Sequence, residues 1–397
     1  MTRLNFNVFD ADNHYYEAPD AFTRHLDRSM AKRAMQWAEI DGRRRLLVGG
    51  RVNRFIPNPQ FDPIARPGCL DDYFRGRSPA DDIRGAFGEL EPIRPEYREP
   101  EARLVVLDRQ GIDGCFLFPT LGVGMEEALV GDPDAAHAAF SAFNRWLEDD
   151  WGLHHADRLL AAPYLCLLDP DQAVAELERV LEHGARVIVM RAGPVMHPTG
   201  GRSPADPVFD PFWRLINEAG ITVAYHSGES GYGRYVTDWG ESAEFEAFRR
   251  TPLYSVLTSD RAIADTMAAL ICHGLFARFP NLRVATIESG SEWVPTLLAK
   301  LGKAFALTPG AFDGAGGDPV AAFRSHVWVA PYYEDDVRGL ADAIGADHVL
   351  FGSDWPHAEG LAEPTDFVDD LDGFTDAEVR LIMRDNGLGL SRPTPTA

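Results

Sequence analysis

Eight short apolar runs, rich in β-branched and aromatic residues, recur along the 397-residue chain. Turn signals and amphipathic helical stretches separate most of them, such as residues 205–220 ahead of the fifth run. Strands that alternate with helices eight times predict an α/β fold, a (β/α)8 TIM barrel rather than an open sheet. The predicted strands are residues 6–12, 114–120, 160–168, 185–191, 221–226, 282–288, 326–332 and 348–354.

One long insertion breaks the regular spacing between the first two strands. Residues 15–110 are rich in Arg, Pro, Gly and Asp. An insertion of this length usually forms a lid, a substrate wall or an oligomer contact. We therefore expect residues 1–397 to form a single barrel domain, with residues 15–110 as a lid or substrate wall.

The charge and apolar patterning exclude several classes of function. The net charge is -23 and the chain has only three lysines, which argues against nucleic acid as a partner. No apolar run approaches the ~20 residues of a membrane span, and the start has no signal-peptide core. The sequence contains neither GxxxxGKS nor GxGxxG, the motifs that would predict a nucleotide cofactor. We expect a cytoplasmic enzyme with a small-molecule substrate and no membrane partner.

Polar residues gather at the C-terminal ends of the predicted strands, where barrel enzymes keep their chemistry. Asp12 and His14 are two residues apart, so in a strand they point to the same face. His226 and Asp354 end the fifth and eighth runs. Two imidazoles and two carboxylates suit zinc, manganese or ferrous iron. Taken singly, these residues are equally typical of solvated turn acids and of capping or core histidines.

The loop after the eighth run supplies further candidates. Asp354 is also a candidate base, because a carboxylate beside a metal-bound water can accept its proton. His357 lies three residues later, and we expect it near the pocket as a catalytic group that orients the substrate or a ligand. We expect Trp355, between them, to contact the substrate.

Four segments carry a family resemblance. VFDADNHYYE, AYHSG, LFARFPNLRVATIESG and LFGSDWPH are similar to the amidohydrolase-related family of the amidohydrolase superfamily, in order and spacing, from residue 8 to about residue 387. The resemblance implies a barrel with a divalent metal at its mouth. It implies metal ligation by Asp12, His14, His226 and Asp354, and it suggests a homodimer.

Three positions depart from that family. The first strand reads DxH where much of the superfamily reads HxH, which exchanges an imidazole for a hard oxygen ligand. Glu288 replaces a strand-six histidine that decarboxylases use, so it is a ligand, a general base or a supporting acid. Arg191 stands where binuclear members carry a carboxylated lysine. It is equally suited to anchor a substrate carboxylate or to form a salt bridge at the rim.

Three functions follow from these residues. We favour a metal-dependent hydrolase that uses metal-activated water on the carbonyl of an amide, ester, lactone or thioester. The expected cofactor is zinc, with manganese or iron as alternatives, as one ion or as two bridged by Asp or Glu. The second function is a metal-dependent decarboxylase or hydratase of an aromatic or unsaturated acid, and the third is a metal-free binding barrel.

Overall fold

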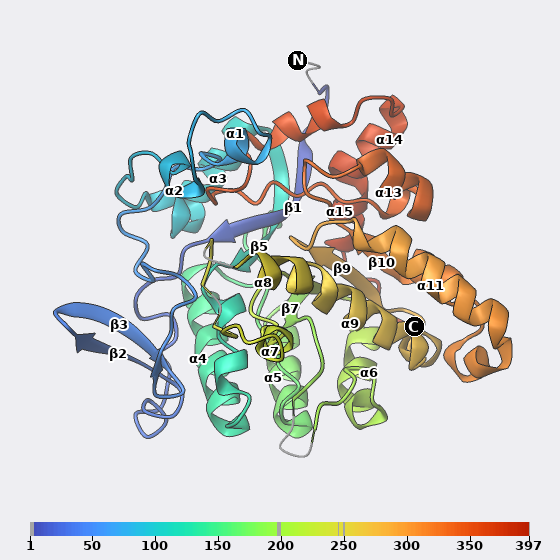
Figure 1. Cartoon of the computed structure of the whole chain (residues 1–397), viewed down its shortest axis with the longest axis horizontal. Coiled ribbons are helices and arrows are strands. Elements are labelled where there is room, and N and C mark those ends of the chain that lie inside the picture. Colours follow the sequence, from blue (N-terminus) through green and yellow to red (C-terminus); the bar gives the residue numbers. More distant parts are fainter. Residues whose placement is uncertain (1–3, 197–199, 245, 249–250, 397) are drawn as a thin grey trace.

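Seven parallel strands line the centre of the computed structural model, which describes residues 4–196, 200–244, 246–248 and 251–396 (Figure 1). Nearly all of their residues are buried. Apolar strands buried on both faces are typical of a parallel sheet covered by helices. In chain order the strands are β1 (Val8–Tyr15), β5 (Ile112–Pro119), β6 (Leu159–Ala161), β7 (Val187–Arg191), β8 (Thr222–His226), β9 (Arg283–Ile287) and β10 (Val327–Val329).

Hydrogen bonds join these strands side by side. The strand order is β1-β5-β6 in one group and β7-β8-β9-β10 in the other. At the first seam, the Val189 N–H donates to the Pro163 carbonyl, and the Leu165 N–H donates to the Val189 carbonyl, both at 3.0 Å. The chain after β6 therefore pairs with β7 and connects the two groups.

The eighth predicted strand, residues 348–354, fills its place in the ring without forming a regular strand. The Leu350 N–H donates to a carbonyl of β10 at 2.8 Å, and the Phe351 carbonyl accepts from an N–H of β1 at 2.9 Å. At Gly352 the segment passes so close to β1 that a Cβ atom would lie only 2.6 Å from the Cβ of Asp12. These bonds close the ring, and the predicted TIM barrel is confirmed.

Helices follow the strands and cover the outside of the barrel (Figure 1). Asp132 and Asp169 begin two of them, with side chains that accept from backbone N–H groups of the first turn and a proline next in the chain. The helices are α3 (Pro100–Gln110), α4 (Pro133–Asp150), α5 (Pro170–Glu182), α6 (Asp210–Ala219), α9 (Arg261–Cys272), α10 (Leu275–Arg278), α11 (Trp293–Leu307), α12 (Pro319–His326), α13 (Val337–Ile344), α14 (Asp376–Arg380) and α15 (Asn386–Leu390). Two further helices, α7 (Arg234–Thr237) and α8 (Pro252–Thr258), lie in the segment between β8 and α9.

The expected insertion, residues 15–110, contains both a regular barrel helix and extra structure. Its last segment, α3, is the barrel helix that precedes β5, so the extra structure ends before Pro100. The remainder holds an antiparallel sheet of β2 (Met35–Ile40), β3 (Arg43–Val48) and β4 (Arg51–Val52), with the short helices α1 (Asp71–Phe74) and α2 (Ile83–Ala86). The hairpin of β2 and β3 projects sideways from the barrel (Figure 1).

Another stretch of the insertion reaches the barrel mouth. The Gly68 N–H donates to the His357 carbonyl at 2.9 Å, and the Leu70 N–H donates to the Ala358 carbonyl at 2.8 Å. This stretch therefore lies against the loop that follows the eighth barrel position. Its role as a lid or substrate wall stays a prediction.

Among the described residues, no helix is both long enough and apolar enough to cross a bilayer.

Candidate metal centre

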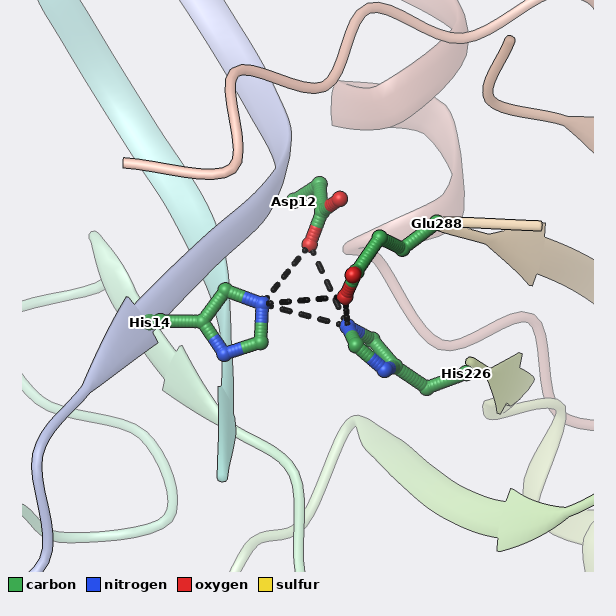
Figure 2. Close-up of side chains that lie close together, drawn as sticks. All are labelled: Asp12, His14, His226 and Glu288. Carbon is green, nitrogen blue, oxygen red and sulfur yellow. Dashed lines mark hydrogen bonds and ion pairs between the residues drawn. The ribbon is translucent and has the colours of Figure 1, made fainter. Parts of the chain in front are cut away.

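Three strand ends bring four side chains together at the mouth of the barrel (Figure 2). Asp12 and His14 come from β1, His226 is the last residue of β8, and Glu288 directly follows β9. Parallel strands end at the same edge of a barrel, which explains why residues so far apart in sequence meet here. The ligand atoms of these four residues all lie within 4.8 Å of one another.

The distances in this group are those of ligands around a single ion. The two imidazole Nε2 atoms of His14 and His226 are 3.1 Å apart. Asp12 Oδ1 lies 3.2 Å from Nε2 of His14 and 3.4 Å from Nε2 of His226. Glu288 Oε2 lies 3.2 Å from Nε2 of His226. Ligands about 2.1 Å from a common ion are separated by roughly 3 to 3.5 Å.

Asp354 joins the same group from the eighth position of the ring. Its Oδ1 atom lies 3.4 Å from Nε2 of His14 and 2.6 Å from Nδ1 of His357. Asp354 thus belongs to a second group with His14, Glu288 and His357, which shares His14 and Glu288 with the first group.

Several buried atoms of this group lack a hydrogen-bond partner among the described residues. They include Asp12 Oδ1, Asp354 Oδ1 and His357 Nδ1. A buried carboxylate oxygen without a donor is costly, and such groups usually mark an ion or another ligand. Oxygen and imidazole donors that converge on one point fit a divalent metal such as zinc, manganese or iron.

Hydrogen bonds behind the cluster fix the orientation of two histidines. His226 Nδ1 lies 2.7 Å from the Ser227 carbonyl, which can only accept, so Nδ1 carries a proton and Nε2 faces the cluster. The Thr120 hydroxyl donates to the Tyr15 carbonyl at 2.8 Å and lies 2.8 Å from Nε2 of His357. Because its single proton is already used, this hydroxyl accepts from His357, whose Nδ1 then faces Asp354.

Burial and neighbouring charges shift the pKa values of the cluster in opposite directions. Burial alone would raise the pKa of Asp12, but the adjacent imidazoles of His14 and His226 outweigh it and lower this pKa. Burial and the charge of Asp354 raise the pKa of Glu288 well above its ordinary value. Burial also lowers the pKa of His14 well below its ordinary value, which favours the neutral imidazole that a metal requires.

The two acids that follow strands have an unusual backbone. Glu288 has a φ of 50° and Asp354 a φ of 55°, both in the left-handed region that L residues with a Cβ seldom occupy. Such strain persists where the surroundings impose it, and it concentrates at functional sites. The fold holds both carboxylates in place despite this local cost.

A buried polar network that the sequence did not reveal lies behind β1. Asp10 accepts from the Ser353 hydroxyl at 2.6 Å and from the Asn13 amide at 2.9 Å, and burial raises its pKa to about 7. The fully buried Arg103 donates to the Asn13 side chain and, at 2.7 Å, to the His14 carbonyl. This network connects β1 to Ser353 in the eighth segment of the ring. The only sign of it in the sequence was that Asp10 lies two residues before Asp12 and therefore faces the same side of the strand.

The expected substrate residue Trp355 is not part of the cluster. It is 4% exposed, and its ring packs on Tyr97 and under the Arg103 guanidinium, 4.6 Å from the ring centroid. These contacts indicate that the Trp355 ring supports the Arg103 side chain. A role in substrate binding stays a prediction.

Arg191 lies beside the cluster in a pocket with about 590 Å³ of empty space, part of it open solvent. Its guanidinium donates to Glu126 at 3.1 Å and to Glu127 at 2.7 Å. It also donates to the carbonyls of Ser230 and Pro194. The sequence allowed two roles for Arg191, and these contacts are those of the first, a salt bridge at the rim. The second role, anchoring of a substrate carboxylate, stays a prediction.

The ring of strands and the cluster at its mouth define a TIM barrel with a candidate metal centre. The sequence model of the family described as amidohydrolase matches residues 19–388. The chain therefore belongs to the amidohydrolase family, as the resemblance implied.

Solved structures agree with this family. An amidohydrolase from Mycobacterium avium subsp. paratuberculosis K-10 is 46% identical, with a TM-score of 0.92, over 98% of this chain and all of that chain (100%). A dihydroxybenzoic acid decarboxylase from Polaromonas sp. JS666, solved with manganese and 2-nitroresorcinol, is 17% identical, with a TM-score of 0.62 and 97% of both chains covered.

A third similar structure is a 5-carboxyvanillate decarboxylase from Novosphingobium aromaticivorans, complexed with manganese and a nitrobenzoic acid. It is 17% identical, with a TM-score of 0.57, over 98% of this chain and 96% of that chain. At this identity, the two decarboxylases share the fold with our chain and do not determine its reaction.

Proposed function

We propose that this amidohydrolase is a metal-dependent hydrolase of a small carbonyl compound, such as an amide, ester, lactone or thioester. The observation that carries the proposal is the position of Glu288. Its Oε2 atom lies 3.2 Å from Nε2 of His226 and 3.9 Å from Nε2 of His14, and its side chain is 22% exposed. A carboxylate thus stands at the open side of the candidate metal centre.

We assign the ion to Asp12, His14, His226 and Asp354. Zinc is the ion we expect, and manganese, which the two decarboxylases bind, is the main competitor. A divalent ion in this place would polarise a carbonyl oxygen and acidify a water molecule.

Glu288 is the proton carrier in this scheme. Hydrolysis adds the oxygen of water to the carbonyl carbon and breaks the bond from that carbon to its nitrogen, oxygen or sulfur. Glu288 takes the proton from water at its carboxylate and returns it to the departing atom, so no proton is gained or lost. His357 lies beside Asp354, with Nδ1 2.6 Å from Asp354 Oδ1.

The test replaces this acid without changing its size. Glu288→Gln is expected to keep the metal and to lower kcat for ester or amide hydrolysis by about 10²- to 10⁴-fold, the range of general base catalysis. Glu182→Gln is the matched control, because Glu182 is exposed at the end of α5, away from the strand ends. Full activity of the Glu288 variant would contradict the assignment.

Decarboxylation is the competing reaction to be measured on the same samples. We expect no carbon dioxide from 2,6-dihydroxybenzoate or 5-carboxyvanillate and measurable release of acid from esters and thioesters. Carbon dioxide from either acid, at a rate that depends on the added metal, would overturn the hydrolase in favour of a decarboxylase.

A further inference from the structure

One arginine of α3 lies behind the candidate metal centre without a carboxylate beside it. The buried residues of α3 are Arg103, Val106, Leu107 and Gln110, and this spacing places them on one face of the helix. The Arg103 side chain is fully buried, yet it forms no ion pair with any residue that the structure describes. A buried arginine is rare unless a carboxylate accompanies it, because its charge loses water. Its place in the fold therefore needs a reason other than charge pairing.

The guanidinium donates to the end of β1, where two assigned ligands lie. Its two terminal nitrogens reach neighbouring acceptors, the Asn13 side-chain oxygen and, at 2.7 Å, the His14 carbonyl. Its Nε donates to the Glu96 carbonyl at 2.7 Å, which fixes the guanidinium to the segment before α3. A planar fork suits two adjacent acceptors, whereas a lysine ammonium is a point charge on a flexible stem. Arg103 thus fixes the residue between Asp12 and His14.

The same guanidinium also packs on the segment that carries Asp354. It lies 4.6 Å from the ring centroid of Trp355, the next residue in the chain. Backbone hydrogen bonds join this segment to β1: the Asp354 N–H donates to the Asp12 carbonyl, and the His14 N–H donates to the Trp355 carbonyl, both at 2.8 Å. Arg103 therefore contacts both segments that supply Asp12, His14 and Asp354, three of the four assigned ligands.

We infer that Arg103 is a positioning residue of the metal centre, whose planar guanidinium holds the end of β1 and the segment of Asp354 and Trp355 in the arrangement that the ion requires. This inference rests on the proposed function, because it takes Asp12, His14 and Asp354 as ligands. The role depends on the fork of the guanidinium as well as on its charge. A variant that keeps the charge and loses the fork therefore separates the two.

Arg98 provides a matched control in the same region. It is half-buried, and its guanidinium donates to three carbonyls, those of Tyr16 and Glu17 just after β1 and that of Gln60. Among the described residues, it donates to no assigned ligand and to no neighbour of one in the chain. Replacing Arg98 or Arg103 therefore removes three hydrogen bonds from one part of the molecule, but only Arg103 touches the centre.

The first test compares the metal affinity of Arg103→Lys and Arg98→Lys. Titration of the metal-free, folded proteins with manganese is expected to show about 10- to 100-fold weaker binding in Arg103→Lys, the cost typical of residues that orient a ligand. Arg98→Lys should bind manganese as the wild type does. Wild-type affinity in Arg103→Lys, or an equal loss in both variants, would overturn the inference.

A second variant serves if Arg103→Lys does not fold. Asn13→Ala removes one of the two acceptors of the fork and leaves every assigned ligand and Arg103 in place. Manganese binding is expected to weaken in this variant within the same range, about 10- to 100-fold. Full affinity would contradict the inference, because the fork to Asn13 would then be unnecessary.

A second readout reports the arrangement of the ligands instead of the affinity. The visible absorption bands of a cobalt-loaded protein depend on the number and geometry of the ligands around the ion. At saturating cobalt, the bands of Arg103→Lys should differ from those of the wild type, and the bands of Arg98→Lys should coincide with them. Unchanged bands in Arg103→Lys would contradict a positioning role, even if this variant were less stable.

The outcomes also separate this inference from the proposed function. If Arg103→Lys binds manganese weakly but the wild type hydrolyses no ester, amide or thioester, the positioning role stands and the hydrolase fails. A wild-type hydrolase with full metal affinity in Arg103→Lys shows the reverse. A wild type that binds neither manganese nor cobalt would contradict both.

Discussion

Two buried groups of charged residues lie side by side at the barrel mouth, and they differ in how their polar atoms are satisfied. In the brace of Arg191 with Glu126 and Glu127, the guanidinium donates to both carboxylates and to two carbonyls. In the cluster around His14 and His226, buried carboxylate oxygens face imidazole nitrogens without hydrogen bonds. A satisfied group maintains the structure, whereas an unsatisfied one implies a missing ligand.

The largest expected effect on stability comes from removing the cation of the satisfied group. Arg191→Met would leave the buried Glu126 and the partly buried Glu127 without their cation and lower the free energy of unfolding by about 3 to 5 kcal/mol. Urea denaturation measures this loss. Metal content per folded chain should remain that of the wild type, since no ligand is changed. Loss of the metal in this variant would show that the two groups are not separate.

Glu17 shares features of both groups, because one of its carboxylate oxygens accepts hydrogen bonds and the other has no hydrogen-bond partner among the described residues. Its Oε1 atom accepts from the N–H groups of Leu121 and Gly122, whereas Oε2 lacks a partner among the described residues. Burial raises its pKa from 4.5 to about 7, so the folded state binds this proton more tightly than the unfolded state. Stability from this group is therefore lost as the pH rises from about 4.5 to 7, by roughly 3 kcal/mol in total.

The difference between Glu17→Gln and the wild type isolates that contribution. The variant has no proton to lose, so its unfolding free energy should gain up to about 3 kcal/mol on the wild type between pH 4.5 and 8. Urea denaturation at several pH values gives the two curves, with Glu182→Gln as the reference. Parallel curves would mean that Glu17 is not protonated near neutral pH.

A smaller effect is expected at Thr120, which positions His357. Thr120→Val keeps the shape and removes the hydroxyl that accepts from the imidazole, so metal affinity should fall about 10- to 100-fold. Thr120→Ser, which keeps the hydroxyl, should restore it. Titration of the metal-free protein with manganese measures both variants. Unchanged affinity in Thr120→Val would remove the threonine from the support of the site.

Strand-end residues were predictable because the barrel imposes their position. Asp12, His226 and Asp354 each close an apolar run, and parallel strands bring such ends to one face whatever the loops do. The same logic placed Glu288, although its role needed the distances to both histidines. The close approach of Gly352 to Asp12 was not predictable, because it depends on how two segments far apart in the sequence pack together.

Partners supplied by loops could not be predicted. Glu126 and Glu127 lie in the loop after β5, far in sequence from Arg191, and nothing local indicates that they pair with it. The hydroxyl of Thr120 and the network of Asp10 with Arg103 are equally dependent on tertiary contacts. The sequence identified which groups carry chemistry, whereas the structure identified what holds them.

The central claim is that the unsatisfied cluster is a metal site, and metal analysis of the purified protein tests it most directly. Mass spectrometry of wild-type protein, stripped and reconstituted with zinc or manganese, is predicted to give one tightly bound ion per chain. His226→Ala and Asp354→Asn should lower the affinity by more than about 100-fold, since even residues that only support a ligand contribute 10- to 100-fold. His273→Ala, at the exposed end of α9, should keep the ion. Full metal content in either ligand variant, or none in the wild type, would contradict the account.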